Sequence, residues 1–582
     1  METLTEKQIL SPDKIDISLQ PPLLNEVDTS QIFNINIGIL GHVDSGKTTL
    51  SKKISTIAST ASFDKNPQSK ERGITLDLGF SALYIKTPSI LKEYFPSNQK
   101  LIQSEYIQIT LVDCPGHASL IKTVVAGSSI IDTMILVIDS MKGIQTQTVE
   151  CILLSEILCD KICIALNKID LLKKESDLDI KVNKLRTVFK NTKFGEDIPI
   201  VPISALTNSN NNDNNDDIKT LLRNVLCCID FQSNLTTNNK EHFLAFVDHC
   251  FSIKNKGTII TSTIIKGNIK PKDEVYFPEL SEKKQVKEMQ MFKKPVQYAT
   301  KGDRVGMLIK DLDSTKIERS IITSPNSGMV TYCQGGLFLV KKIRLFKTEL
   351  LSHSKLYLMI GNQGVNAKCL FFEANDNNLI TNSDSKSFSS SELKKVNINL
   401  NTFYSKEYPY IEQISNEFCF AFIKFDNKIL VPNDMLFIGS KIDIDISQKT
   451  NRLAFYGKIL DANVNQVESK LKLFRMKSKE GSILRIKDDE VIVRGLFKKD
   501  NTSINNYIGK KVYIKQDKTI QGDIMSTFGQ SGKLKIKFNK DLTQVEMKTE
   551  EGETIKGYKN LIVVLEYKKY LKLSESEIKE KK

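Results

Sequence analysis

The sequence contains no run of about 18 apolar residues, the length at which an α-helix can cross a bilayer. Its first ten residues, METLTEKQIL, lack the basic start and apolar core of a secretory signal peptide. We therefore expect no membrane contact and a cytoplasmic location.

The sequence also lacks cysteine pairs with the spacing of a zinc site. Its ten cysteines form no CxxC pair of that kind, and the adjacent Cys227 and Cys228 cannot supply one. This pattern is typical of reduced thiols in a cytosolic protein, and it argues against a zinc knuckle.

The composition that is present is that of a soluble globular protein, with 40% hydrophobic and 26% charged residues. A chain of 582 residues holds about three to five domains of ordinary size. Its 83 Lys and Arg residues exceed its 69 Asp and Glu residues, for a formal net charge of +14. That excess favours a polyanionic partner such as RNA.

A glycine-rich loop follows the apolar run from Ile35 to Leu40. Residues 41–48 read GHVDSGKT, which has the G-x-x-x-x-G-K-[ST] spacing of a phosphate-binding loop, and a helical pattern follows. The glycines let backbone N–H groups surround a phosphate, and the helix start adds the positive end of its dipole. We expect Lys47 to reach the β and γ phosphates and the Thr48 hydroxyl to bind Mg²⁺.

Two further stretches fit the same site. Asp113 ends an apolar strand and opens DCPGH, so its carboxylate can hold Mg²⁺ through water while the Gly116 N–H binds the γ phosphate. The RGIT stretch lies between this strand and the glycine loop, and it offers Thr75 as a second Mg²⁺ ligand.

The motifs that follow the next apolar strands indicate that the bound nucleotide carries a guanine base. In NKID the Asp170 carboxylate can accept hydrogen bonds from guanine N1–H and N2–H₂, which adenine cannot supply, and Asn167 can read O6. Ser204–Ala205 follows another apolar strand and can place a backbone N–H on the same O6. In this order the motifs predict a GTPase that binds GTP, GDP and Mg²⁺. The residues expected to contact the nucleotide are Gly41, Asp44, Ser45, Gly46, Lys47, Thr48, Thr49, Asp113, Gly116, Asn167, Lys168, Asp170, Ser204 and Ala205.

The remaining pattern predicts four domains. Over residues 31–232 apolar strands alternate with helical patterns, which indicates an α/β P-loop GTPase domain whose largely parallel sheet binds nucleotide at its carboxyl ends. Period-two alternation then predicts three small β-barrel-type domains over 240–325, 328–462 and 466–582.

Two polar stretches are predicted to be disordered, namely a tail over residues 1–30 and an insertion at about 374–412. Charge gathers in the last domain instead: residues 466–582 hold 27 Lys and Arg against 17 Asp and Glu, so 27 − 17 = +10. The charge favours an RNA contact. The aromatic residues interleaved with it fit a barrel core better than a base-stacking surface.

The motifs resemble those of the translational GTPases, the family of elongation factor Tu. GHVDSGKT, RGIT, DCPGH and NKID carry the likeness. In that family the histidine of DCPGH orients the water that attacks the γ phosphate when the ribosome triggers hydrolysis. The resemblance therefore implies that His117 is the catalytic residue, because phosphoryl transfer depends mainly on positioning.

The second domain departs from the general factor. Residues 248–250 are Asp-His-Cys where that factor has an acidic and then a hydrophobic residue, and residues 302–304 are Gly-Asp-Arg where it has GDN. With residues 58–80 and FGQSGK at 528–533, these make the chain similar to the eukaryotic and archaeal selenocysteine-specific elongation factors.

This resemblance implies an aminoacyl pocket formed by Phe63, Asp248, His249 and Arg304. Selenocysteine carries a negative selenolate at neutral pH, so Arg304 and His249 can pair with it while Asp248 supports them. Serine would leave these donors badly paired, which discriminates strongly. Without the resemblance, Arg304 also fits a surface ion pair.

The same resemblance implies that the partners are selenocysteinyl-tRNA and the ribosome, with delivery at UGA codons. The last domain would connect to a SECIS-type mRNA element through an RNA-binding partner protein, and we expect a monomer. Three alternatives are a general aminoacyl- or initiator-tRNA carrier, a regulatory GTPase without tRNA cargo, and an inactive scaffold. His249 with Arg304 argues against the first, and the intact nucleotide motifs argue against the last.

Overall fold

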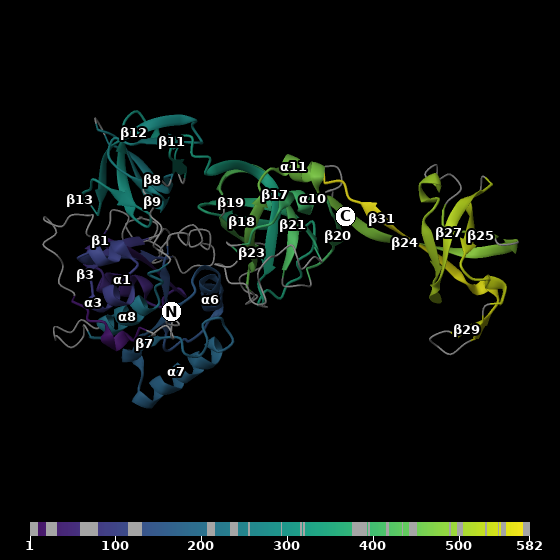
Figure 1. Ribbon diagram of the computed structural model, residues 1–582. Coiled ribbons are helices and arrows are strands. Elements are labelled where there is room, and N and C mark those ends of the chain that lie inside the picture. Colours follow the sequence, from purple (N-terminus) through teal and green to yellow (C-terminus); the bar gives the residue numbers. More distant parts are fainter. Residues whose placement is uncertain are drawn as a thin grey trace, which may run out of the picture. The chain divides into compact units, whose positions relative to one another are not determined.

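The computed structural model (Figure 1) describes residues 10–18, 32–58, 79–114, 131–206, 216–232, 242–374 and 393–573, apart from gaps in the last two ranges. The gaps are 254–255, 293, 315–316, 318–319, 394–395, 415–417, 434, 442–450, 488–489, 498–503, 530–531, 545 and 549–553. The chain divides into two compact units, which we describe separately. Unit 2 consists of Phe372–Asn375, Asn399–Ile411 and Glu468–Lys582, and unit 1 holds the rest.

Unit 1 begins with a seven-stranded sheet in the order β2-β3-β4-β1-β5-β6-β7. The five strands from β4 to β7 in that order are parallel, whereas β3 and β2 run antiparallel at one edge. Near-continuous apolar strands form such a sheet because both of its faces are buried. The bounds are β1 Ile32–Gly41, β2 Ile57–Ala58, β3 Gly79–Lys86, β4 Tyr106–Asp113, β5 Thr133–Asp139, β6 Ile162–Asn167 and β7 Ile200–Pro202.

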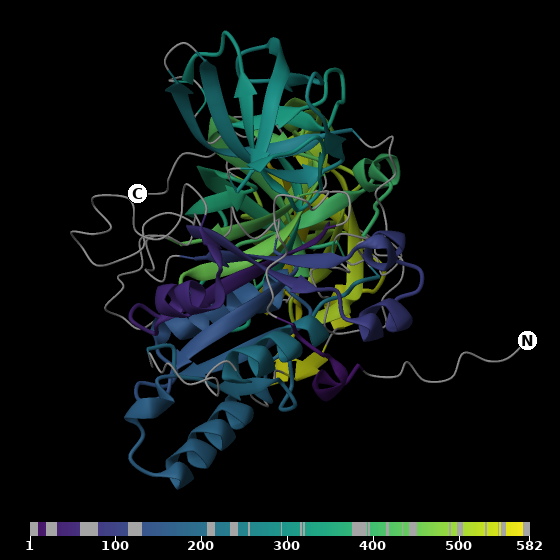
Figure 2. The ribbon, with the colours of Figure 1, turned by 90° about the vertical axis from the view of Figure 1, so that its left-hand side faces the viewer.

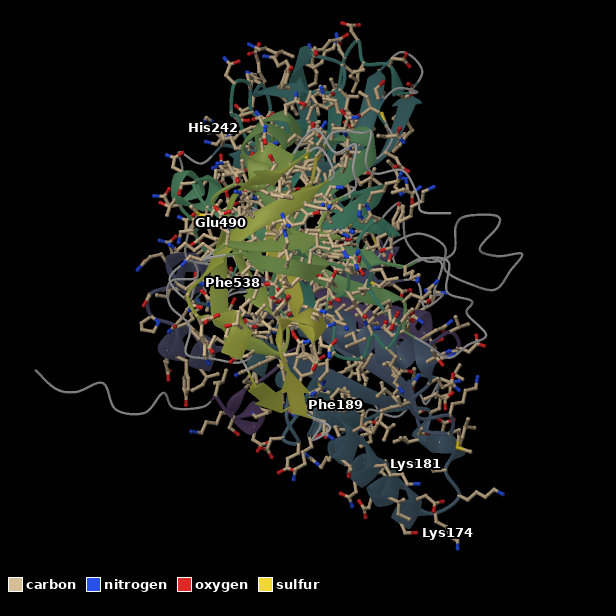
Figure 3. The ribbon with its side chains drawn as sticks, turned by 90° about the vertical axis from the view of Figure 1, so that its right-hand side faces the viewer. Lys174, Lys181, Phe189, His242, Glu490 and Phe538 are labelled. Carbon is tan, nitrogen blue, oxygen red and sulfur yellow. The ribbon has the colours of Figure 1, made fainter. Side chains whose placement is uncertain are left out.

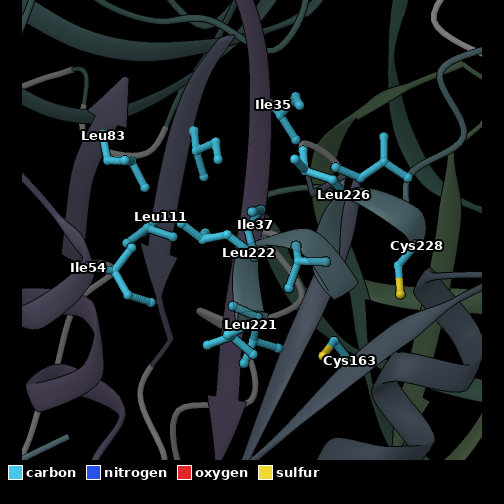
Figure 4. Close-up of a cluster of buried hydrophobic side chains, with 14 of the residues drawn as sticks. Ile35, Ile37, Ile54, Leu83, Leu111, Cys163, Leu221, Leu222, Leu226 and Cys228 are labelled. Carbon is cyan, nitrogen blue, oxygen red and sulfur yellow. The ribbon is translucent and has the colours of Figure 1, made fainter. Parts of the chain in front are cut away.

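Helices of this domain pack apolar faces onto the sheet. In α8 the buried residues recur at helical spacing, and Figure 4 shows Leu221, Leu222 and Leu226 gathered with Ile35 and Ile37 of β1. Phe189 at the end of α7 is also buried, and Figure 3 labels it together with Lys181. The helix bounds are α1 Lys47–Ile54, α3 Ser89–Tyr94, α4 Gln99–Gln103, α6 Thr146–Leu158, α7 Glu175–Phe189 and α8 Asp216–Cys227.

The N-terminal stretch differs from its prediction. The disordered tail predicted over residues 1–30 is wrong for residues 10–18, which include the short helix η1 (Pro12–Lys14). Ile15 and Ile17 are 1% and 3% exposed in the core, and Arg223 Nε of α8 donates a hydrogen bond to the Ile15 carbonyl at 3.0 Å. Two alternating isoleucines anchor a segment whose average composition is polar. Residues 1–9 and 19–30 lie outside the described residues.

The next domain is a six-stranded ring, β11-β16-β8-β9-β15-β12, that closes through pairing of β11 with β12. Figure 2 shows its strands in teal, wrapped into a barrel. Alternate side chains such as Val275 and Met307 fill the interior. The bounds are β8 Leu244–Ile253, β9 Gly257–Lys266, β11 Glu274–Phe277, β12 Glu282–Met291, β15 Arg304–Ile309 and β16 Ile321–Thr323.

A second ring, β18-β22-β23-β17-β21-β19, closes through β18 and β19. It is tied to the GTPase domain by a buried ion pair, in which Arg452 Nε lies 3.3 Å from Glu150 Oε1 of α6. The bounds are β17 Val330–Lys342, β18 Lys355–Ile360, β19 Gln363–Phe372, β21 Phe418–Pro432, β22 Leu436–Ser440 and β23 Leu453–Asp461.

Unit 2 contains a third ring, β24-β25-β28-β27-β26-β31, closed by pairing of β24 with β31. Its core includes Ile483 and Phe497, while Tyr507 and Phe538 pack against that core. Most of its aromatic residues therefore stabilise the barrel. The bounds are β24 Lys472–Lys487, β25 Glu490–Arg494, β26 Lys511–Ile514, β27 Asp517–Phe528, β28 Lys533–Phe538 and β31 Ile562–Tyr570.

Part of the predicted insertion belongs to unit 2. Disorder is wrong for the segment that holds α10 (Leu400–Tyr404) and β20 (Glu407–Ile411). β20 pairs in parallel with β24, and the Phe403 ring stacks on Tyr408 with centroids 4.6 Å apart. These aromatic residues lie among polar ones in the sequence, so the average composition of the segment does not predict that it folds. Residues 375–392 and 394–395 lie outside the described residues. Among the described residues, none of the helices combines the length and the apolar character that a membrane span requires.

Candidate nucleotide and aminoacyl site

The glycine loop between β1 and α1 leaves no room for side chains at two positions. Gly41 and Gly46 have φ of +153° and +92°. A Cβ on Gly41 would lie 2.3 Å from the Val137 carbonyl oxygen, and one on Gly46 would lie 2.2 Å from Asn167 Nδ2. Ser45 Oγ is buried with no hydrogen-bond partner among the described residues. The loop therefore has the tight curvature and an available polar atom that a phosphate cradle needs.

The residues expected to bind phosphate and Mg²⁺ lie together at the carboxyl ends of β1 and β4. Lys47 Nζ donates to the His42 carbonyl at 2.8 Å, and Thr48 Oγ1 donates to Asp113 Oδ2 at 2.7 Å. Burial lowers the pKa of Lys47, and nearby Asp113 opposes that shift. A hydroxyl and a carboxylate are oxygen ligands of the kind that Mg²⁺ prefers, so Thr48 and Asp113 fit this ion.

Asn167 joins two loops of the site. Its Nδ2 donates to the Ser45 carbonyl at 2.9 Å, and its Oδ1 accepts a hydrogen bond from the Ala205 N–H at 3.0 Å. The Ala205 N–H, expected on guanine O6, is thus directed to Asn167. Direct reading of O6 by Asn167 remains a prediction.

The neighbouring residues of NKID are held by similar contacts. Lys168 Nζ donates to the Asp44 carbonyl at 2.7 Å and lies 2.8 Å from Asp139 Oδ2. Burial works against ionisation of Asp139, but hydrogen bonds from Lys168 and two backbone N–H groups hold its pKa below the usual value. The exposed Asp170 carboxylate accepts from Ser204 Oγ at 2.5 Å, which orients it at the end of β6.

Asn167→Ala should weaken GTP and GDP binding equally. The substitution leaves the buried Ser45 carbonyl and Ala205 N–H without this partner, at about 1–3 kcal/mol each, so affinity should fall at least tenfold. Titration calorimetry with both nucleotides measures the change. Asn183→Ala, at an exposed position of α7, is the matched control. Unchanged affinity in Asn167→Ala would show that the link between the loops is dispensable.

Of the other expected site residues, one lies in the described part of the chain and four do not. Thr49 lies half-buried in the first turn of α1. Thr75, Phe63, Gly116 and His117 lie outside the described residues, so their roles remain predictions.

The first barrel brings two of the expected aminoacyl residues together. Arg304 Nη1 donates to Asp248 Oδ2 at 2.5 Å, from the start of β15 to a bulge in β8. The Arg304 side chain is 7% exposed and that of Asp248 27%. Burial lowers the pKa of Arg304, and Asp248 opposes that shift. His249 is half-buried next to the bulge, and no described hydrogen bond or ion pair joins its ring to Arg304 or Asp248.

Comparison with known proteins covers each domain. Residues 33–250 match the elongation factor Tu GTP binding domain, and residues 257–322 match elongation factor Tu domain 2. Residues 337–457 match the third domain of the eukaryotic selenocysteine-specific elongation factor, and residues 469–577 match the eEFSec C-terminal RIFT domain.

Whole-chain relatives decide the family. The mouse selenocysteine-specific elongation factor is 38% identical over 541 residues, which cover 86% of this chain and 88% of that protein. The chain belongs to the selenocysteine-specific elongation factors. The Methanocaldococcus jannaschii selenocysteine-specific elongation factor is 30% identical, with 89% of this chain and 97% of its own length covered.

A solved structure agrees with this family. Translation elongation factor SelB from Methanococcus maripaludis, in complex with the GTP analogue GppNHp, is 25% identical with a TM-score of 0.65, and the match covers 94% of this chain and 99% of that one. The findings confirm the predicted P-loop GTPase domain followed by β-barrel domains. As a selenocysteine-specific elongation factor, the chain is a translational GTPase that binds and hydrolyses GTP.

Sequence reasoning missed residues that hold the Arg304 loop against the GTPase sheet. Asn34 Nδ2 and Asn36 Nδ2 of β1 each donate to the Gly302 carbonyl at 2.8 Å. The alternation Asn-Ile-Asn-Ile was a usable signal, because two asparagines on one face of a central strand need partners. Phe80 of β3 was also missed, and no local pattern marks it.

Proposed function

We propose that this factor, in its GTP state, binds selenocysteinyl-tRNA and delivers it to the ribosome at UGA codons. The observation that carries the proposal is the buried pair of Arg304 and Asp248 in the first barrel of a chain of this family. A buried guanidinium has more N–H donors than Asp248 can accept, so donors remain for an anionic side chain.

Charge explains the preferred cargo. Selenocysteine is ionised at neutral pH, whereas serine is not, and a buried donor discriminates against a ligand that pairs with it poorly. His249 and Phe63 would complete the pocket as predicted from the family resemblance. Asp248 keeps the guanidinium charge balanced when no cargo is bound.

The nucleotide site would control release of the cargo. Lys47 and the loop N–H groups would hold the phosphates. Thr48 and Thr75 would hold Mg²⁺ directly and Asp113 would hold it through water, and the ion would neutralise phosphate charge. His117 would orient the attacking water once the ribosome engages the complex. Loss of the γ phosphate would then free the segments that it had ordered.

The last domain would supply the contact to the message. Its net charge of 27 − 17 = +10 supports an electrostatic interaction with an RNA or RNA–protein surface. We propose that it connects to a SECIS-type element through an RNA-binding partner protein, and that the factor acts as a cytoplasmic monomer.

Protection of the aminoacyl ester tests this function. Selenocysteinyl-tRNA mixed with the GTP-bound factor should hydrolyse much more slowly than with the GDP-bound factor, because the ester is enclosed only in the GTP state. Equal hydrolysis in both states would favour a GTPase without tRNA cargo.

His117→Ala should bind GTP normally and lose ribosome-stimulated turnover by roughly 100-fold or more, because the attacking water is no longer oriented. Single-turnover hydrolysis with and without ribosomes measures the loss. Replacing exposed His242 with alanine is the control. Normal stimulation in His117→Ala would remove the catalytic assignment.

A further inference from the structure

Arg304 has a second neighbour besides Asp248. Its Cζ lies 3.5 Å from the centroid of the Phe80 ring, although the two residues come from different domains of unit 1. Phe80 is 1% exposed, so the contact is shielded from water. A guanidinium stacked on an aromatic face is held by cation–π attraction, which is strongest where both groups are desolvated.

The backbone around Arg304 is fixed at the same interface. The Gly302 carbonyl accepts the two hydrogen bonds from Asn34 and Asn36, and the Thr300 N–H donates to Asp303 Oδ2 at 2.8 Å. The loop therefore presents the side chain from a set position. The hydrogen bond to Asp248 holds one edge of the Arg304 guanidinium, and the Phe80 ring lies against its face.

Phe80 also connects this plane to the nucleotide site. It is the second residue of β3, where Gly79 pairs with Asp113 and Phe80 pairs with Val112. Asp113 is the carboxylate that accepts from Thr48 of α1. A short path of direct contacts thus runs from the proposed Mg²⁺ ligands to Arg304.

We propose that Phe80 is a positioning residue that determines amino-acid specificity. Its ring sets the plane of the Arg304 guanidinium, so that the donors not used by Asp248 face the side chain of the cargo. Without the ring, the guanidinium can rotate about its bond to Asp248 and its donors lose their direction. This inference rests on the proposed function, because it assumes that Arg304 contacts the amino acid.

The test compares the affinities of selenocysteinyl-tRNA and seryl-tRNA for the GTP-bound full chain. Phe80→Leu and Phe80→Met remove the ring but keep an apolar side chain, and Phe80→Tyr keeps the ring. The preference for selenocysteine should fall about tenfold in the first two and persist in Phe80→Tyr. GTP affinity should stay nearly constant, since the Phe80 ring packs against Arg304 of the first barrel and Phe80 is not among the residues expected to bind the nucleotide.

Leu83→Val is the matched control, because Leu83 lies on the opposite face of β3 and packs in the core of the GTPase domain. Two results would overturn the inference: an unchanged preference in Phe80→Leu and Phe80→Met while Arg304→Ala loses it, or an equal fall in Leu83→Val. An unchanged preference in Arg304→Ala as well would instead defeat the proposed function. If Phe80→Leu does not fold, the comparison of Phe80→Met with Phe80→Tyr decides.

Discussion

Gly46→Val should weaken GTP binding roughly 100-fold or more. Gly46 has φ of +92°, where a β-branched residue is strained by about 1–3 kcal/mol. Its new Cβ would lie 2.2 Å from Asn167 Nδ2 and would displace the side chain that joins the Ser45 and Ala205 backbones. Losing those hydrogen bonds adds about 1–3 kcal/mol each, and every 1.4 kcal/mol of binding is about tenfold.

Titration of the variant with GTP and GDP measures this effect. Gly195→Val is the matched control, because Gly195 also has a positive φ, of +74°, but its Cβ would meet nothing within 4 Å. Backbone strain without a clash should leave nucleotide affinity near that of the unaltered protein. Normal GTP binding by Gly46→Val would contradict the geometry assigned to the loop.

Arg304→Ala should lower affinity for selenocysteinyl-tRNA roughly 100-fold, because truncating one partner of a buried charge pair costs about 2–5 kcal/mol. The partly buried Asp248 carboxylate would remain without its cation and would repel the selenolate. Seryl-tRNA should lose much less, since its hydroxyl carries no charge. Filter binding with the GTP-bound protein measures both affinities.

Two further variants sharpen that experiment. Arg304→Lys keeps the charge but not the planar set of donors, so its affinity should lie between those of the unaltered protein and Arg304→Ala. Arg344→Ala removes an exposed arginine elsewhere in unit 1 and should change neither affinity. If Arg344→Ala lowered the affinity for selenocysteinyl-tRNA as much as Arg304→Ala, the effect would come from the protein's overall positive charge and not from the pocket.

The meeting of Thr48 with Asp113 was predictable because their motifs combine fixed spacing with strand ends. Parallel strands place the residues after β1, β4 and β6 at one edge, so Thr48 and Asp113 had to meet. The bridging role of Asn167 was not predictable, because it depends on how closely two loops approach.

Other features depend on contacts between distant residues. Phe80 and Arg304 meet only when the first barrel lies against β3, and neither sequence neighbourhood indicates the other. The polar averages of the tail and the insertion concealed Ile15 and the aromatic pair Phe403 and Tyr408, which find their partners in the folded protein. Composition describes a segment on average, whereas one or two buried side chains are enough to order it.

The central claim is that a buried cation in the first barrel selects an ionised amino acid. The most direct test is competition between selenocysteinyl-tRNA and seryl-tRNA, of the same tRNA sequence, for the unaltered GTP-bound factor. We predict that selenocysteinyl-tRNA binds about 100-fold more tightly or better. Equal affinity for the two would contradict the claim.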